Sequence, residues 1–243
     1  MTPQSPPASL PMPSSLPTPP AKVLPPGLGS GTPLHLPLRD GSTVDGTFWA
    51  PTTVPAPLVV FAPGPREPPT PFLRVLMALR GQRDLGVVLL APDAVAPLAE
   101  PHARWRREQE RLRAVVAWSR QPPVGSADSQ APLVFVASLD AALAALHLAA
   151  ADPAVRAAAL LSLPAAATGT AWDEAVETVA RRQLFLAWTA PDAPVHEALA
   201  ARLQNAKGGL VASADRGIAL LETPRVASDL SGWLHAALGP APP

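Results

Sequence analysis

Apolar positions follow a changing pattern along the chain, and from about residue 30 onward this pattern predicts alternating strands and helices. Two alternating stretches, 33–39 and 42–50, flank Asp40-Gly41, which predicts a β-hairpin around a two-residue turn. Beyond this hairpin, short continuous apolar runs alternate with longer stretches of helical periodicity. The expected strands are 57–62, 85–90, 133–136, 155–161, 184–188 and 210–213. The expected helices are 72–79, 105–118, 139–150, 171–181, 195–205 and 226–238.

The alternation predicts an α/β fold built as one domain over residues 31–243. A continuous apolar run suits a strand that is covered on both faces, as in a parallel sheet. Right-handed crossovers then place helices on both faces of a mostly parallel sheet, and the hairpin adds an antiparallel N-terminal edge. The charged residues within 104–111 mix both signs, which indicates a solvated helix face.

Residues 1–30 have a different composition. Ten prolines lie before residue 27, and Lys22 is the only charged side chain before Arg39. Proline fixes φ and lacks an amide donor, so we expect an extended, disordered, proline-rich arm. It is interpreted as an unselected tail, a spacer or a ligand for a proline-binding groove. Without the basic start and apolar run of a secretory signal, the sequence favours a cytoplasmic protein.

Composition excludes several function classes. Nineteen basic side chains balance nineteen acidic ones, so charge gives no reason to expect nucleic-acid binding. The absence of cysteine excludes disulfides and thiolate chemistry, and five scattered histidines make a zinc site unexpected. No apolar run is long enough to predict a membrane span. We therefore expect no metal, no cofactor and no membrane-spanning segment.

Several short motifs carry a family resemblance through their order and spacing. They are Asp40-Gly41 with 46–51 (GTFWAP), 59–64 (VVFAPG), 89–93 (LLAPD), 137–139 (ASL), 151–156 (ADPAVR) and 160–162 (LLS). In this order the chain resembles the α/β-hydrolase superfamily, in particular dienelactone-hydrolase-like and related esterases. The resemblance implies a nucleophilic serine on a sharp strand-to-helix turn, followed along the chain by an acid and a histidine. It also implies two backbone amides that hold an oxyanion.

The resemblance places Ser138 at the nucleophile position, but Val136 and Asp140 replace the two flanking glycines. Valine would crowd the turn, and the Asp140 carboxylate would oppose a developing negative charge, so both residues alter the site. Two other interpretations stay open. The Ser138 hydroxyl could simply cap the following helix, or a shifted register could put Leu139 at the nucleophile position.

The remaining positions of the implied site depart further from the family pattern. Asp192 follows a strand where the family has its acid, although it is equally interpreted as a loop aspartate. Arg216 stands where the histidine is expected, and arginine stays protonated, so it cannot act as a general base. We predict an ion pair from Arg216 to Asp192 or Asp140. The amides of Gly64 and Leu139 are the expected oxyanion donors.

No other histidine stands at the expected place. Of His35, His102, His147, His196 and His235, His102 is the one to test as a displaced base. Three functional hypotheses follow. The first is a fold that has lost serine-hydrolase activity and acts as a binding or scaffold module for an unknown small molecule or protein. The second is an active ester or amide hydrolase with a rearranged site around Ser138, and the third is an interaction protein that works through the proline-rich arm.

Overall fold

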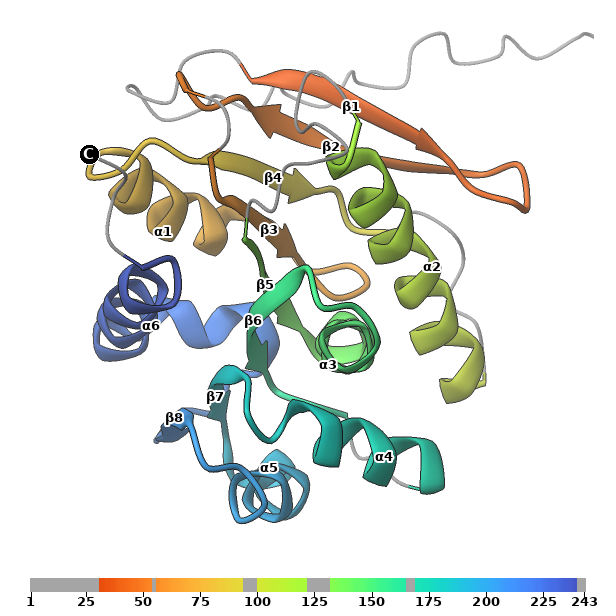
Figure 1. Cartoon of the computed structure of the whole chain (residues 1–243). Helices are drawn as coiled ribbons and strands as arrows, with labels where there is room; N and C mark the ends of the chain where they lie inside the picture. The colour runs from red at the N-terminus through yellow and green to blue at the C-terminus, as the bar shows by residue number, and fades with distance from the viewer. Residues whose placement is uncertain (1–30, 54–55, 94–99, 122–131, 165–168, 240–243) are drawn as a thin grey trace, which may run out of the picture.

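One eight-stranded sheet runs through the protein in a computed structural model that describes residues 31–53, 56–93, 100–121, 132–164 and 169–239 (Figure 1). The proline-rich arm expected over 1–30 lies outside the described residues. The strands are β1 (Thr32–Pro37), β2 (Thr43–Trp49), β3 (Leu58–Ala62), β4 (Gly86–Leu90), β5 (Leu133–Ser138), β6 (Val155–Leu161), β7 (Gln183–Trp188) and β8 (Ala206–Leu210).

The strand order is β1-β2-β4-β3-β5-β6-β7-β8. β1 pairs with β2, and β2 with β4, in antiparallel fashion, whereas every other neighbouring pair is parallel. The α-helices are α1 (Thr70–Arg80), α2 (Pro101–Ser119), α3 (Leu139–Ala151), α4 (Thr170–Val179), α5 (Ala193–Ala200) and α6 (Pro224–Ala237). Two short 3₁₀ helices are η1 (Ala190–Asp192) and η2 (Gly217–Glu222). The predicted architecture, a mostly parallel sheet with an antiparallel N-terminal hairpin, is confirmed.

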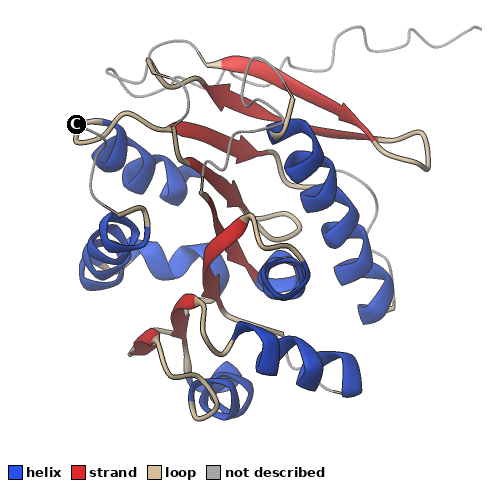
Figure 2. Ribbon diagram, viewed as in Figure 1, coloured by secondary structure: helices blue, strands red, loops and turns tan. Residues whose placement is uncertain are grey.

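The central strands are apolar throughout because helices cover both faces of the sheet (Figure 2). In β3, Leu58 and Val60 point into the apolar cluster shared with α2, α3 and α4. Val59 and Phe61 point into the opposite cluster, which α1, η2 and α6 complete. All five side chains of β3 are buried, so the continuous apolar run correctly predicted a strand buried on both faces. Within the described ranges, no helix has the length and apolar character needed to cross a bilayer.

Three boundaries predicted from the sequence are wrong. The hairpin loop has three residues, because the Leu38 amide still donates to the Ser42 carbonyl at 2.8 Å and Gly41 has the left-handed φ of 82°. The last strand lies at 206–210 instead of 210–213, since an edge strand does not need the apolar run that marked the others. The helix expected over 195–205 ends at Ala200.

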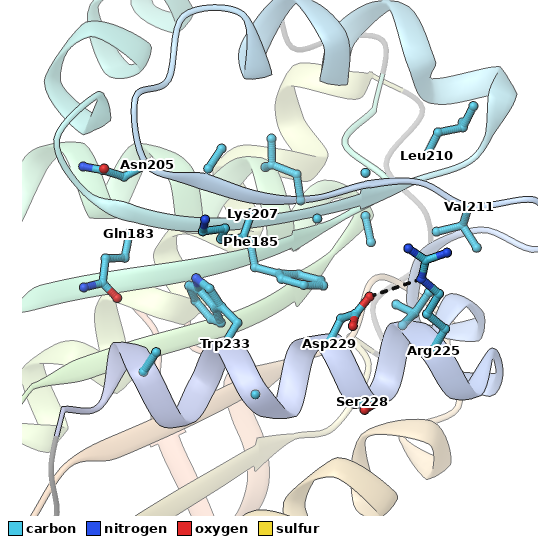
Figure 3. Close-up of a pocket in the computed structure, with 18 of the residues that line it drawn as sticks. Gln183, Phe185, Asn205, Lys207, Leu210, Val211, Arg225, Ser228, Asp229 and Trp233 are labelled. Atoms are coloured by element: carbon cyan, nitrogen blue, oxygen red, sulfur yellow. Dashed lines mark ion pairs between the residues drawn. The ribbon is translucent and has the colours of Figure 1, made fainter.

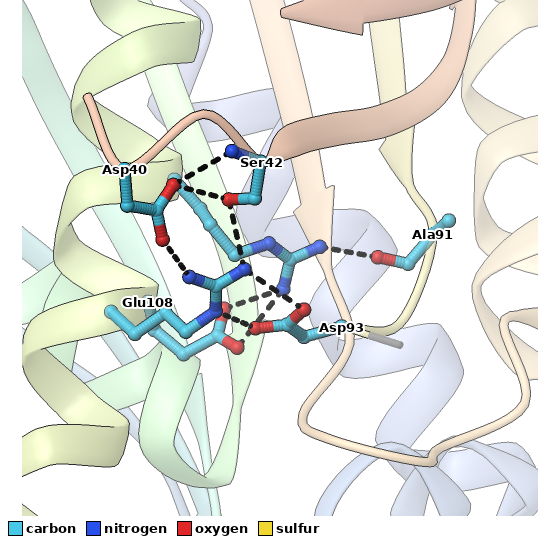
Figure 4. Close-up of polar contacts among 7 residues, drawn as sticks. Asp40, Ser42, Ala91, Asp93 and Glu108 are labelled. Atoms are coloured by element: carbon cyan, nitrogen blue, oxygen red, sulfur yellow. Dashed lines mark hydrogen bonds and ion pairs between the residues drawn. The ribbon is translucent and has the colours of Figure 1, made fainter. Parts of the chain in front are cut away.

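A charged network ties α2 to the β1–β2 loop and to the segment after β4 (Figure 4). Arg107 donates to Asp40 at 2.7 Å and also hydrogen-bonds with Asp93. Each of its two carboxylate partners therefore lies on a different segment, and one guanidinium holds three parts of the chain together.

The adjoining pair of this network is buried. Arg111 donates through Nη1 to both carboxylate oxygens of Glu108, at 2.9 and 2.8 Å, and hydrogen-bonds with the Ala91 carbonyl. Glu108 is 1% and Arg111 2% exposed, so the expectation of a solvated face over 104–111 is wrong at these two residues. Burial raises the pKa of Glu108 from 4.5 to about 7, against the opposing effect of Arg111.

Replacing Glu108 with glutamine tests this burial. Because the folded state raises the pKa of Glu108, its contribution to stability is present below pH 4.5 and is lost as pH rises through about 7. The loss amounts to about 3 kcal/mol. Urea unfolding from pH 5 to pH 8 is expected to show a smaller loss of stability with rising pH in Glu108→Gln than in the wild type. Exposed Glu110 provides the control, and Glu110→Gln should keep the wild-type loss. An unchanged loss in Glu108→Gln would contradict the prediction.

Candidate active site

The loops that follow the parallel strands meet at one edge of the sheet and define the candidate site. Parallel strands place all their carboxyl ends at the same edge, where open α/β sheets bind their ligands. Gly64 and Glu67 follow β3, Ser138 ends β5, and Asp192 lies just after β7. The structure thus brings together residues that lie more than 120 positions apart in the sequence.

The sharp turn between β5 and α3 falls on Leu139. The strand ends at Ser138 in an extended conformation, and Leu139 has a left-handed φ of 53°. Two small buried residues, Ala137 and Ala141, flank the turn. Val136 lies in the apolar cluster on the α1 and α6 face of the sheet.

Asp140 immediately follows the turn residue, and its side chain contacts α2. Its carboxylate lies 3.5 Å from the guanidinium Nε of Arg104, and the side chain is largely buried. Burial raises the pKa of Asp140, and Arg104 opposes this shift. The ion pair predicted for Arg216 therefore does not use this carboxylate.

The Ser138 hydroxyl is fully buried and has two partners. It accepts a hydrogen bond from the Gly64 amide at 2.9 Å and donates to the Glu67 carboxylate. It makes no hydrogen bond to the amides of α3, so the interpretation of Ser138 as a helix cap is wrong. The side chain that faces this serine is a carboxylate.

Glu67 is the site residue that sequence reasoning missed as a partner of Ser138. Its Oε2 accepts from Ser138 and from the Gly64 amide at 2.6 Å, and its Oε1 accepts from the Ile218 amide at 2.8 Å. Burial raises the pKa of Glu67, while these three hydrogen bonds lower it. The sequence signal was its place three residues after Gly64, inside the loop expected to supply an oxyanion donor.

Arg216 and Asp192 form a two-bonded ion pair, as predicted. The Arg216 Nε lies 3.1 Å from one carboxylate oxygen of Asp192, and Nη2 contacts the other. The Asp192 side chain is 2% exposed, whereas that of Arg216 is 47% exposed. A buried carboxylate is therefore neutralised by a partly solvated cation.

All five histidines lie in the described part of the chain, and none of them hydrogen-bonds with the Ser138 hydroxyl. His196 is the nearest in sequence to Asp192, and its Nε2 accepts from the Leu163 amide at 2.7 Å. Its ring stacks on Trp188 at 4.9 Å between centroids, and burial lowers its pKa to about 4, so it is neutral at pH 7. His102 accepts from the indole of Trp105 and is exposed, so it has no contact with the site.

Backbone strain gathers at the same edge. Among the described residues, three that are not glycine have positive φ, and these are Arg66 (67°), Leu139 (53°) and Ser162 (53°). They follow β3, β5 and β6, and Ser162 accepts a hydrogen bond from the Gly217 amide at 2.9 Å. Left-handed residues cost about 1–2 kcal/mol each and concentrate at sites where a loop must be aimed.

A groove between β8 and α6 lies outside the candidate site. It has a volume of about 1150 Å³ (Figure 3). Phe185 and Trp233 contribute aromatic rings 5.8 Å apart, and Lys207 lies on the edge strand. Ser138, Glu67 and the Arg216 pair are not part of this lining. In the described ranges, no group of three or more His, Cys, Asp or Glu side chains is arranged to hold a metal ion.

Several solved structures with this arrangement of strands and helices are esterases or other hydrolases. An esterase of Pyrococcus furiosus is 12% identical, over 86% of this chain and 93% of that chain, with a TM-score of 0.65. The chain has the α/β-hydrolase fold. A dienelactone hydrolase from Anabaena variabilis is 18% identical, over 84% and 96% of the two chains, with a TM-score of 0.60. The esterase domain of a Rhodothermus marinus protein is 17% identical, with the same coverages and a TM-score of 0.58.

At these identities the comparison establishes the fold alone. No family model and no curated protein matches the chain. The α/β-hydrolase fold supports many chemistries, so function must be argued from the site.

Replacing Gly217 with alanine tests the placement of Glu67. A Cβ at Gly217 would lie 1.9 Å from the Glu67 Oε1, and its φ of 61° disfavours any side chain. We expect Gly217→Ala to lose about 2–3 kcal/mol of unfolding free energy in urea. Combined with Glu67→Ala, the cost should fall to about 1–2 kcal/mol, from backbone strain and a remaining 3.2 Å contact with the Leu139 Cγ.

The matched control is Gly232→Ala. Gly232 lies within α6, and no heavy atom comes within 4 Å of an added Cβ, so this change should stabilise by about 0.5–1 kcal/mol. Equal costs for Gly217→Ala with and without Glu67 would contradict the placement of the carboxylate.

Proposed function

We propose that this α/β-hydrolase-fold protein does not hydrolyse esters or amides through a serine and acts as a binding or scaffold module. One observation carries the proposal: the Ser138 hydroxyl is buried against the Glu67 carboxylate, with no imidazole in contact. A serine hydrolase needs a base that takes the serine proton and then delivers it to the leaving group.

The turn geometry supports the same proposal. In the α/β-hydrolase fold the nucleophile sits on the strained turn between strand and helix. Here the left-handed residue is Leu139, and small residues flank it on both sides. We assign Leu139, rather than Ser138, to the nucleophile position. A leucine side chain has no atom that can attack a carbonyl.

The charges at the acid and base positions also support the proposal. Arg216 occupies both carboxylate oxygens of Asp192, so this acid has a permanent cation as its partner instead of an imidazole. Glu67 meanwhile occupies the Gly64 amide that an oxyanion would need. An acceptor already bound to that amide takes the place of the oxyanion that develops in acyl transfer.

One observation favours the alternative of an active hydrolase. Ser138 donates to Glu67, and burial raises the pKa of this carboxylate, which makes it a stronger base. Such an enzyme would use a serine and a glutamate and would depend on movement of the loop after β3 to expose the hydroxyl. The third hypothesis, interaction through the arm at 1–30, lies outside the described residues.

A fluorophosphonate probe separates the two candidate functions. The probe forms a covalent bond with an activated serine. Because we propose that Ser138 is not activated, the intact mass of the wild type is expected to stay unchanged after incubation. Turnover of short p-nitrophenyl esters should equal that of Ser138→Ala. A mass increase that disappears in both Ser138→Ala and Glu67→Gln would instead establish a serine hydrolase with Glu67 as its base.

A further inference from the structure

Both oxygens of the Glu67 carboxylate are held by a set of donors that other segments supply. Oε2 accepts from the Gly64 amide and the Ser138 hydroxyl, and Oε1 accepts from the Ile218 amide. These donors come from the loop after β3, the end of β5 and the start of η2. No salt bridge in the described part of the chain includes Glu67, so hydrogen bonds alone hold this carboxylate.

Two of these three donors belong to the backbone, and the Ile218 amide is kept in place independently of the Glu67 side chain. Gly217, next to Ile218, is anchored through its own amide to Ser162. Ser138 is the last residue of a central strand that pairs on both sides. If Glu67 were removed, the Ile218 amide and the Ser138 hydroxyl would lose their acceptor, whereas the Gly64 amide would keep the Ser138 oxygen. An unpaired buried donor is costly.

The surrounding glycines give the carboxylate its room. A Cβ on Gly217 would lie 1.9 Å from Oε1, and one on Gly64 would lie 2.9 Å from Oε2. The loop that carries Glu67 reaches this position through Arg66, whose φ of 67° is unfavourable for a residue with a side chain. The contacts of the carboxylate therefore hold its loop in a strained conformation.

We propose that the amides of Gly64 and Ile218 and the hydroxyl of Ser138 form a carboxylate-binding site, which Glu67 fills from within the chain and which a free carboxylate can fill in its place. The ligand class is a small carboxylate or a molecule that ends in one. This inference rests on the proposed function, because it assigns a ligand class to a site that binds rather than reacts.

The size of the ligand can be matched to the size of the deletion. Glu67→Ala removes the atoms of one acetate, and Glu67→Gly removes those of one propionate. At pH 7 and constant ionic strength, we expect 100 mM acetate to raise the thermal midpoint of Glu67→Ala above its value in chloride. A dissociation constant of about 10 mM would increase the ratio of folded to unfolded protein about tenfold. Propionate should exceed acetate only in Glu67→Gly.

Three controls isolate the site. The wild type and Glu67→Gln should show no difference between 100 mM acetate and chloride, because the tethered side chain competes with the free ion for the same donors. Glu222→Ala removes an exposed carboxylate that pairs with Arg74, and it should likewise show none. Adding Ser138→Ala to Glu67→Ala removes one of three donors and should weaken acetate binding several-fold, as measured by calorimetry.

If Glu67→Ala does not fold in chloride, refolding yield becomes the measurement. A yield restored by acetate and not by chloride supports the carboxylate site. Equal thermal midpoints, or equal refolding yields, in the two salts overturn it. Fluorophosphonate labelling of the wild type is a separate measurement, so failure of the proposed function and failure of this inference give different results.

Discussion

The hydrogen bonds of the Glu67 carboxylate are the interaction on which the candidate site depends. They join the loop after β3, the end of β5 and the start of η2 at the carboxyl edge of the sheet. One side chain thus accepts from three buried donors, and it takes the hydrogen bond that the Ser138 hydroxyl donates.

The second constraint is the balance of charge between the loops after β7 and β8. Asp192 is buried, and Arg216 neutralises it through two hydrogen bonds. A buried carboxylate without this partner would be costly to ionise. Arg216 therefore links the loops after β7 and β8.

The molecule has a well-packed apolar sheet interior and a set of strained loops at one edge of the sheet. The sheet interior is apolar on both faces, and β3 shows how alternate residues supply the two separate clusters. The left-handed residues Arg66, Leu139 and Ser162 all follow strands at one edge. Burial of the strands stabilises the fold and so sustains unfavourable backbone conformations in the loops that they carry.

Most of the fold followed from the sequence. Strands buried on both faces must be continuously apolar, and the apolar residues on one face of a helix must recur with the helical period. The hairpin, the parallel strands and the order of elements were predictable on this basis. The resemblance predicted an ion pair of Arg216 with Asp192 or Asp140, and the structure pairs it with Asp192. β8 was misplaced, because an exposed edge strand such as 206–210 carries no apolar run. The buried pair of Glu108 and Arg111 was missed, because neither charge pattern nor periodicity reports which side of a helix meets another segment.

The tertiary structure alone decided what faces Ser138. Glu67 is 71 positions away in the chain, and a glutamate in a proline-rich loop has no sequence pattern that distinguishes a site residue from a solvated one. Which residue takes the sharp turn was also undecided between Ser138 and Leu139, since it depends on where the strand stops pairing. Local spacing determines which segments become strands and helices, whereas contacts between distant loops depend on how those segments are stacked in three dimensions.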